Sequence, residues 1–238
     1  MKILAYGVRD DEKPYFKTWQ AAHPEVTVSL TPAILDEHSV DEAAGCDGIS
    51  ILQTDPVGPA VFERLVKENV RAVSSRIVGT DAMALDTAKK LGIKVTNVPA
   101  YSPAAIAEFT VSQLLQLLRN TRRFEAKIHA QDFRWAPDVS QELNQQTVGV
   151  IGTGRIGRAA IKIYRGFGAK VVAYDVYHNA ELEKEGIYVD TLADLYQAST
   201  VITLHAPATK DDFHMLDQDA FAQMNDGVWI VNAGRGTL

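Results

Sequence analysis

Three glycines and an aspartate are spaced in this sequence as they are in sites that bind a diphosphate and a ribose. Gly152, Gly154 and Gly157 form a G-x-G-x-x-G motif between the apolar run 148–151 and a helical pattern over 158–168. In such motifs the first glycine makes a tight turn, the second lets a pyrophosphate approach the backbone, and the third lets the helix pack on its strand. The N–H groups at the start of the helix then hold the diphosphate.

Asp175 ends the next apolar run, twenty-one positions beyond Gly154. A carboxylate at this distance can accept hydrogen bonds from both hydroxyls of an adenosine ribose, and it repels the additional phosphate of NADP. Val176 and Tyr177 follow, so no arginine stands there to pair with a phosphate. An ordinary glycine turn is the alternative, but the strand, helix and acid together favour a nucleotide site that takes NAD.

Arg235 comes shortly after the apolar run 228–232, and His205 is the last residue of the run 201–205; both runs are typical of strands. A guanidinium can grip a carboxylate through two hydrogen bonds and polarise a neighbouring carbonyl. From its position alone, however, Arg235 could equally be a surface residue after a strand. We interpret His205 as a cofactor neighbour or structural donor rather than a general acid. No H-x-x-H or Cys/His cluster is present, so we expect no metal site.

Strands and helices alternate along the chain, which predicts an α/β fold of two doubly wound parallel-sheet domains. We expect a domain over 1–100 and a Rossmann domain over 101–238. Between them Ser102 can cap a helix that begins at Pro103. The helical pattern continues to about residue 130, with an apolar first half that suggests burial near the domain seam. Its second half carries four basic residues, which we interpret as a solvated face rather than an anion site: Arg119, Arg122, Arg123 and Lys127.

The composition is that of a cytoplasmic globular protein. The 238 residues are 46% hydrophobic and carry a net charge of −6, with dispersed basic residues that argue against nucleic acid as a partner. Cys46 has no second cysteine to pair with, which suits a reducing compartment. The N-terminus does not read as a signal peptide, and no apolar run approaches the roughly eighteen residues of a membrane helix.

Five motifs occur together and in order along the chain. They are NVPAYSPAAIAE at 97–108, TVGVIGTGRIG at 147–157, GFGAKV at 166–171, HAP at 205–207 and NAGRG at 232–236. The set resembles the D-isomer-specific 2-hydroxyacid dehydrogenases, and within them the D-lactate and D-2-hydroxyisocaproate dehydrogenases of lactic acid bacteria. The resemblance implies a flavodoxin-like substrate domain, a Rossmann NAD domain, and a homodimer whose interface involves the helix after Pro103.

The resemblance also implies roles for individual residues. Arg235 is expected to bind the carboxylate and carbonyl of a 2-keto acid, and the backbone amides of Val78 and Gly79 to hold the same carboxylate. Tyr101 is expected to line this pocket. Beside Gly152, Gly154, Gly157 and Asp175, further cofactor contacts are expected at Arg155, Ile156, His205, Ala206, Pro207, Asp212, Ala233 and Gly234.

The sequence departs from the family pattern in three places. The family's catalytic histidine and its partner acid lie downstream of the arginine, so with the chain ending at Leu238 we expect an incomplete C-terminus and an absent proton donor. Ile77, Ala82 and Ala84 replace polar residues of the substrate loop, which suggests that the loop is altered. Leu52 stands where lactate-specific relatives tend to carry tyrosine, which predicts room for a longer or branched substrate.

The sequence therefore predicts NAD-dependent reduction of pyruvate or a longer 2-keto acid to the D-2-hydroxy acid by hydride transfer. Reduction also requires a proton, and a positioned general acid typically contributes about 10²–10⁴-fold. The alternative is a protein that binds NAD and acts without turnover, as corepressor-like relatives of this fold do. The presence of Arg235 and Tyr101 favours the dehydrogenase over the binding protein.

Overall fold

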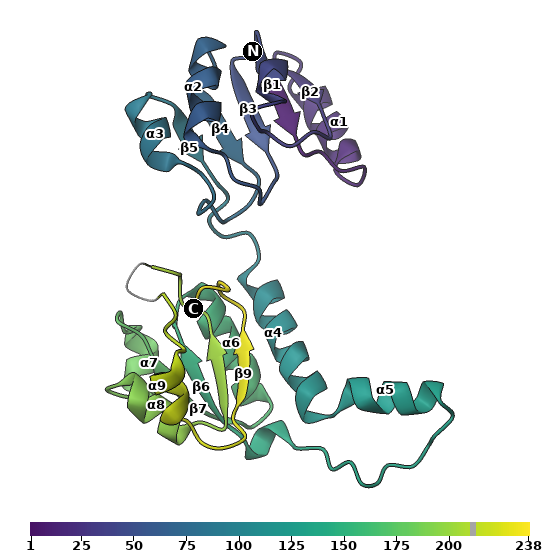
Figure 1. Cartoon of the computed structure of the whole chain (residues 1–238), viewed down its shortest axis with the longest axis vertical. Coiled ribbons are helices and arrows are strands. Elements are labelled where there is room, and N and C mark those ends of the chain that lie inside the picture. The colour runs from purple at the N-terminus through teal and green to yellow at the C-terminus, as the bar shows by residue number, and fades with distance from the viewer. Residues whose placement is uncertain (210–212) are drawn as a thin grey trace. The chain divides into compact units, whose positions relative to one another are not determined.

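The computed structural model describes residues 1–209 and 213–238, which form two compact units, Met1–Tyr101 and Ser102–Leu238 (Figure 1). Each unit is built on a sheet whose described strand pairings are all parallel. This is the α/β architecture with two parallel sheets that the alternating pattern predicts. Within the described residues, no helix has the length and apolar character needed to cross a membrane.

The first unit contains a five-stranded sheet in the order β2-β1-β3-β4-β5. Its strands are β1 (Lys2–Tyr6), β2 (Thr27–Leu30), β3 (Gly48–Ile51), β4 (Ala72–Ser75) and β5 (Lys94–Thr96). Its helices are α1 (Lys13–Ala22), α2 (Pro59–Lys67), α3 (Leu85–Lys90) and the 3-10 turn η1 (Val40–Ala43). The chain moves from β1 outward to β2 and then back past β1 to β3, so the strand order reverses between β1 and β3.

The core of the first unit lies on the α2 side of its sheet. Phe62 and Leu65 of α2 are fully buried against Ile51 of β3 and Val73 of β4. Removing such side chains from water supplies most of the stability of a sheet of this size. Helix α1, by contrast, buries none of its residues.

The second unit contains a four-stranded sheet in the order β7-β6-β8-β9. Its strands are β6 (Thr147–Ile151), β7 (Lys170–Tyr174), β8 (Val201–Leu204) and β9 (Trp229–Asn232). Its helices are α4 (Pro103–Leu118), α5 (Thr121–His129), α6 (Arg155–Gly166), α7 (Ala180–Lys184), α8 (Leu192–Ala198) and α9 (Gln218–Ala222), with the 3-10 turn η2 at Leu143–Gln145.

Two hydrophobic clusters cover the two faces of this sheet. On one face α4 packs on α6, with Leu114 and Tyr164 in a cluster that includes Val148 of β6. On the other face Leu195 of α8 packs with Ile202 of β8. The chain passes from β6 to β7 and returns to β8 on the other side of β6, so the order reverses between β6 and β8. In sheets of this kind ligands bind at the carboxyl ends of the strands where the order reverses.

The long helix expected after Pro103 is in fact two helices. The Ser102 hydroxyl accepts a hydrogen bond from the Ala105 N–H, as expected of a cap, but α4 ends at Leu118. Asn120 adopts a left-handed conformation with φ of +51°, which asparagine tolerates better than most residues. Its side-chain amide donates to the Val139 carbonyl, so tertiary contacts hold the break that helical periodicity did not predict.

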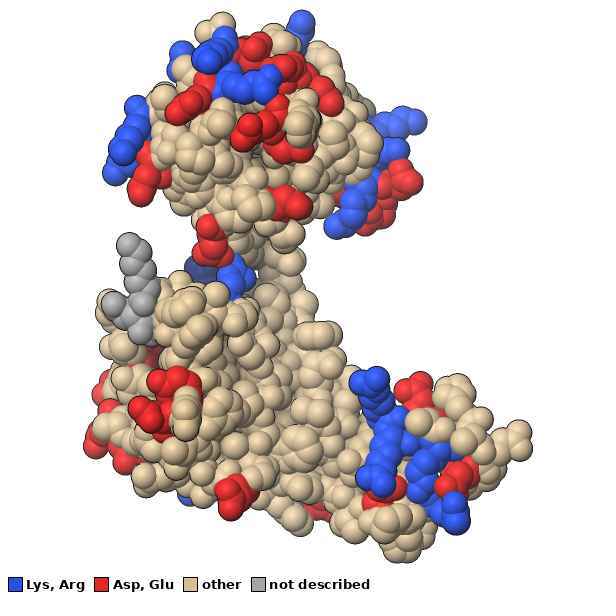
Figure 2. Space-filling model, viewed as in Figure 1, with Lys and Arg blue, Asp and Glu red and all other residues tan. Residues whose placement is uncertain are grey.

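The basic half of this segment is partly paired. Figure 2 shows blue side chains gathered over α5. Arg123 and Lys127 both form ion pairs with Asp138, whose side chain is only 4% exposed. The four basic residues are therefore not all on a freely solvated face, because two of them neutralise a buried carboxylate.

Candidate functional site

The loop between β6 and α6 has the geometry that its three glycines predict. Gly152 adopts a φ of +92°, and a Cβ there would lie 2.7 Å from the Ala206 nitrogen, so only glycine fits. A Cβ on Gly157 would lie 2.0 Å from the carbonyl oxygen of Gly152, which shows that the third glycine packs against the turn itself. A Cβ on Gly154, in contrast, would meet nothing within 4 Å. The second glycine is therefore open on the side from which a ligand approaches.

Helix α6 begins directly after this loop, and no side chain caps its N-terminus. Arg155 and Ile156 are its first two residues, so their N–H groups belong to the first turn and have no intrahelical partner. Over its twelve residues the helix dipole adds partial positive charge at the same place. The loop and helix start together form a cradle suited to a diphosphate.

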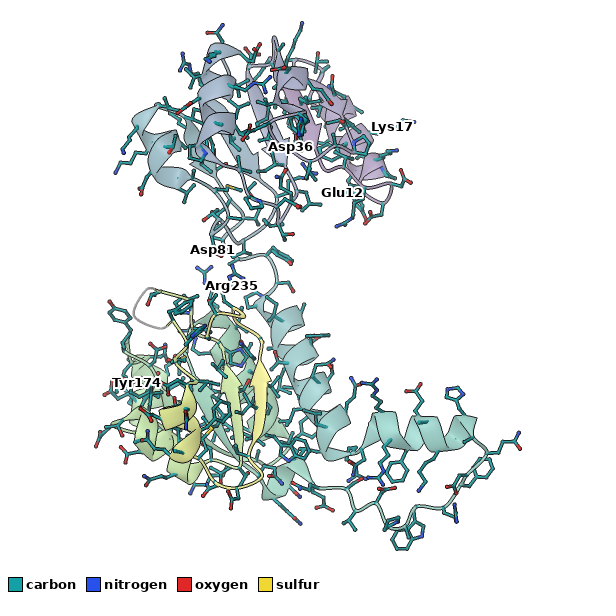
Figure 3. The ribbon with its side chains drawn as sticks, in the orientation of Figure 1. Glu12, Lys17, Asp36, Asp81, Tyr174 and Arg235 are labelled. Carbon is teal, nitrogen blue, oxygen red and sulfur yellow. The ribbon has the colours of Figure 1, made fainter. Side chains whose placement is uncertain are left out.

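The Asp175 carboxylate is fixed against the glycine loop. Its Oδ2 accepts hydrogen bonds from the N–H of Thr153 at 2.6 Å and from the Thr153 hydroxyl at 3.1 Å, and its Oδ1 accepts from the Tyr177 N–H at 2.9 Å. Asp175 follows Tyr174, the last residue of β7, which is labelled in Figure 3. The carboxylate is therefore pre-oriented at the carboxyl end of the sheet, with oxygen lone pairs left for ribose hydroxyls.

Sequence reasoning missed the residues that support Asp175. The Thr153 hydroxyl lies 2.7 Å from the Tyr188 hydroxyl, which also accepts a hydrogen bond from the Asn179 N–H. The Tyr188 ring stacks on His178 with centroids 3.9 Å apart. Thr153 is a variable position of the glycine motif, and Tyr188 comes into place through an isolated bridge to Ala173. No sequence signal pointed to either residue.

A cavity of about 420 Å³ lies over these groups. Its lining includes the predicted residues Gly152, Gly154, Asp175, His205 and Pro207. It also includes residues that the sequence did not single out as cofactor contacts: Thr153, Arg158, Tyr177, His178 and Asn179. The β6 loop, the end of β7 and the end of β8 thus meet at one site, at the point where the strand order reverses.

His205 follows β8 and lies under this cavity. Its N–H donates to the Ile151 carbonyl, and its imidazole Nε2 lies 3.0 Å from the buried Thr203 hydroxyl. Burial lowers the pKa of His205 to about 4. The imidazole is therefore neutral near pH 7, and its Nδ1 is buried without a hydrogen-bond partner in the described part of the chain. A buried polar atom of this kind fits a bound ligand better than an empty site.

Arg235 extends from the turn after β9 (Figure 3). Asn232 shapes this turn: its side-chain oxygen accepts from the Gly234 N–H at 2.8 Å, and its side-chain nitrogen donates to the Arg235 carbonyl at 2.9 Å. Ala233 and Gly234 lie within the same turn. Since β9 pairs with β8, the turn is at the same edge of the sheet as His205. Ala206 and Pro207 follow His205 there, whereas the predicted contact Asp212 lies outside the described residues.

The predicted substrate residues belong to the first unit. Val78 and Gly79 lie in the loop after β4, and Leu52 follows β3 with a half-buried side chain. A Cβ on Gly7 would lie 2.2 Å from the Leu52 carbonyl, so the loops after β1 and β3 touch where the strand order of this sheet reverses. Tyr101 is 70% exposed at the end of the unit.

Comparison with known proteins identifies the family of this chain. The family described as "D-isomer specific 2-hydroxyacid dehydrogenase, NAD binding domain" matches residues 111–238. A D-lactate dehydrogenase of Lactiplantibacillus pentosus is 58% identical over all 238 residues, which cover 72% of its length. The chain belongs to the D-isomer-specific 2-hydroxyacid dehydrogenases. The family and the cofactor expected from the motifs are thereby confirmed: NAD is the cofactor, and the reaction interconverts a 2-keto acid and its D-2-hydroxy acid.

Solved structures agree with this assignment. The structure of a D-2-hydroxyisocaproate dehydrogenase matches with a TM-score of 0.88 and 44% identity, covering 100% of this chain and 72% of that one. A D-lactate dehydrogenase from Aquifex aeolicus, complexed with NAD and lactic acid, matches with a TM-score of 0.86 and 33% identity, covering 99% of this chain and 69% of that one. Three features of the second unit fit a bound NAD: the glycine cradle, the fixed Asp175 carboxylate, and the His205 Nδ1 that has no partner among the described residues.

Proposed function

We propose that this dehydrogenase reduces pyruvate or a longer, branched 2-keto acid, and that Arg235 is the residue that anchors the substrate. The observation that carries the proposal is the position of Arg235 on a turn shaped by Asn232, directly after β9 of the sheet that carries the nucleotide loop. Its planar guanidinium can bind the substrate carboxylate through two hydrogen bonds and polarise the adjacent carbonyl.

In this proposal the cofactor is held by residues of the second unit. The N–H groups of Arg155 and Ile156 bind the diphosphate, Gly154 leaves room for it, and Asp175 accepts hydrogen bonds from the adenosine ribose. His205, Ala206, Pro207, Ala233 and Gly234 contribute further contacts along the same sheet edge. A negative charge at Asp175 also disfavours the extra phosphate of NADP.

Bound NADH supplies the hydride, and the chain supplies orientation and charge. Arg235 stabilises the negative charge that develops on the carbonyl oxygen during reduction. The proton that completes the alcohol does not come from His205, because burial lowers the pKa of its imidazole to about 4. An imidazole that is neutral at pH 7 has no imidazolium proton to give, so we assign His205 a role in positioning the cofactor.

We assign further substrate contacts to residues of the first unit. The backbone amides of Val78 and Gly79 hold the carboxylate, and Tyr101 lines the pocket. Leu52 faces the substrate tail. Leucine is smaller than tyrosine and apolar, so it leaves space for an isobutyl tail, which favours longer or branched acids.

We further propose a cytoplasmic homodimer that uses neither nucleic acid nor membrane. Helix α5 buries none of its residues, and two aromatic side chains follow it in exposed positions, Phe133 at 79% and Trp135 at 72%. Exposed aromatic residues of this kind are typical of subunit interfaces. Sedimentation of the chain and of Trp135→Ser tests the dimer, which the substitution should weaken.

The function is tested by NADH binding followed by NADH loss on addition of pyruvate or 2-ketoisocaproate, with the chirality of the product determined. Arg235→Lys should raise the KM for the keto acid and lower kcat, because an ammonium group cannot form the two parallel hydrogen bonds of the guanidinium. The Kd for NADH should stay the same. Arg134→Lys is the matched control, because Arg134 is 84% exposed and pairs with Asp132. Unchanged kinetics in Arg235→Lys would contradict the role of Arg235. An intact enzyme that binds NADH without consuming either acid would support the binding-protein alternative.

A further inference from the structure

Two consecutive peptide groups of the loop after β4 are held from one side by the segment that follows β5. The Ile77 carbonyl accepts a hydrogen bond from the Val98 N–H at 3.2 Å. The Val78 carbonyl accepts a hydrogen bond from the Asn97 side-chain amide at 2.7 Å. Both carbonyls therefore face the segment 97–98.

The planarity of the peptide bond carries this constraint to the opposite side of the loop. In a trans peptide group the C=O and the following N–H point in opposite directions. The Ile77 carbonyl and the Val78 N–H share one such group, and the Val78 carbonyl and the Gly79 N–H share the next. With both carbonyls facing Asn97 and Val98, both N–H groups face away from them. Neither N–H donates a hydrogen bond within the residues that the structure describes.

We infer that Asn97 is a positioning residue that aims the Gly79 N–H at the substrate carboxylate. The inference rests on the proposed function, in which the amides of Val78 and Gly79 hold that carboxylate. Donation from the Asn97 amide fixes the plane of the Val78–Gly79 peptide group. It also polarises this group, which makes its N–H a better donor to an anion.

The surrounding structure explains why a side chain is needed for this task. The ladder between β4 and β5 ends at the pair Ser74 and Thr96. Beyond it the strands no longer pair regularly, so the loop carbonyls need other donors. The Val98 backbone satisfies one carbonyl, and the Asn97 side chain satisfies the next.

The start of the loop is anchored independently of Asn97. The Arg76 guanidinium donates to the Tyr6 carbonyl at 3.0 Å and to the Ser50 hydroxyl at 3.1 Å, and it forms a 3.2 Å ion pair with Glu12. Because these contacts persist without Asn97, and Asn97 is exposed, its replacement should change the aim of the amide and leave the fold intact.

The test measures two constants, the Kd for NADH by its fluorescence and the KM for pyruvate from the initial rate of NADH loss. Loss of one hydrogen bond changes affinity by about two- to tenfold. Asn97→Ala should therefore weaken pyruvate binding by about that factor and leave NADH binding unchanged. Asn97→Asp, which keeps the shape but replaces the donor with a negative charge, should weaken pyruvate binding further. Thr96→Ala, at the neighbouring exposed position, is the matched control and should change neither constant.

Methyl pyruvate distinguishes loss of the orientation of the Gly79 N–H from a general disturbance of the substrate site, because its ester carries no anionic carboxylate. The Asn97→Ala penalty should shrink or vanish with this compound. Pyruvate binding at the wild-type level in both Asn97→Ala and Asn97→Asp would overturn the inference and leave the proposed function standing. The same conclusion would follow if Asn97→Ala weakened the binding of pyruvate and of methyl pyruvate by equal factors. Absence of NADH loss when pyruvate is added to the unmodified enzyme would instead overturn the proposed function, and the inference with it.

Discussion

The backbone N–H of Thr153 donates a 2.6 Å hydrogen bond to Asp175 Oδ2, which fixes the carboxylate that follows β7 to the glycine loop that follows β6. The proposed ribose site and the proposed diphosphate site are thereby joined by a hydrogen bond before any nucleotide binds. Such preorganisation reduces the entropic cost of ordering the site when a ligand binds.

Asp175→Asn should weaken NADH binding and reduce the preference for NADH over NADPH. Hydrogen bonds to a charged group contribute about 1.5–3 kcal/mol, which corresponds to about 10- to 100-fold in Kd. Loss of the negative charge also removes repulsion of the 2′-phosphate. Asp190→Asn, at an exposed position away from the cavity lining, is the control. A variant that keeps the wild-type ratio of the two Kd values would exclude Asp175 as the selecting residue.

Gly154→Ala should weaken NADH binding, whereas Gly157→Ala should lower the stability of the fold. At Gly154 a Cβ meets nothing within 4 Å, so the thermal midpoint should remain near that of the parent while NADH binding weakens, because the methyl group stands where the diphosphate approaches. At Gly157 a Cβ would lie 2.0 Å from the Gly152 oxygen. Overpacking of this kind typically costs about 1–3 kcal/mol, so unfolding should shift to lower temperature. Calorimetry and NADH titration on both variants distinguish the two effects, and a matching loss of stability in both would contradict the assignment.

Leu52→Tyr should shift preference toward pyruvate. A phenol ring occupies the space that we assign to the tail of a longer acid, and a mismatch of this size in an apolar pocket changes kcat/KM by about 10-fold or more. The ratio of kcat/KM for 2-ketoisocaproate to that for pyruvate is the quantity to measure. Leu52→Met, which keeps the volume, should leave the ratio close to its original value. If Leu52→Tyr also leaves this ratio of kcat/KM values unchanged, Leu52 does not face the substrate.

His205 should make the protein less stable in acid. Its pKa is about 4 in the folded state and about 6.5 when unfolded, so between these values the unfolded chain binds a proton that the folded chain does not. The free energy of unfolding therefore falls as the pH falls from about 6.5 to 4, by about 2 kcal/mol between pH 7 and pH 5. Well above pH 6.5 the imidazole is neutral in both states and this effect vanishes.

His205→Gln should remove that part of the acid sensitivity. Urea unfolding of the parent and the variant at pH 7 and pH 5 measures it, with His38→Gln, an exposed histidine, as the control. Equal losses of stability in the parent and His205→Gln would show that the imidazole is not buried in its neutral form.

The sequence alone determined the local pattern of both sheets and the chemistry of the nucleotide loop. The apolar runs 148–151, 201–205 and 228–232 located β6, β8 and β9 to within one residue. The glycine spacing identified Gly152, Gly154 and Gly157 because a backbone conformation that only glycine accepts is a local property. Asp175, His205 and Arg235 could be located because each follows a strand, and parallel strands end at one edge.

Only the tertiary structure decided what holds those residues in place. Tyr188 supports Asp175 through Thr153, although thirty-five positions separate Tyr188 from Thr153 in the chain. Asn97 reaches the Val78 carbonyl across nineteen positions, and the break at Asn120 depends on a contact with Val139 that is equally distant in sequence. Hydrogen bonds between such distant residues leave no period or spacing in the sequence, because they arise only when packing of the sheets brings the partners within reach.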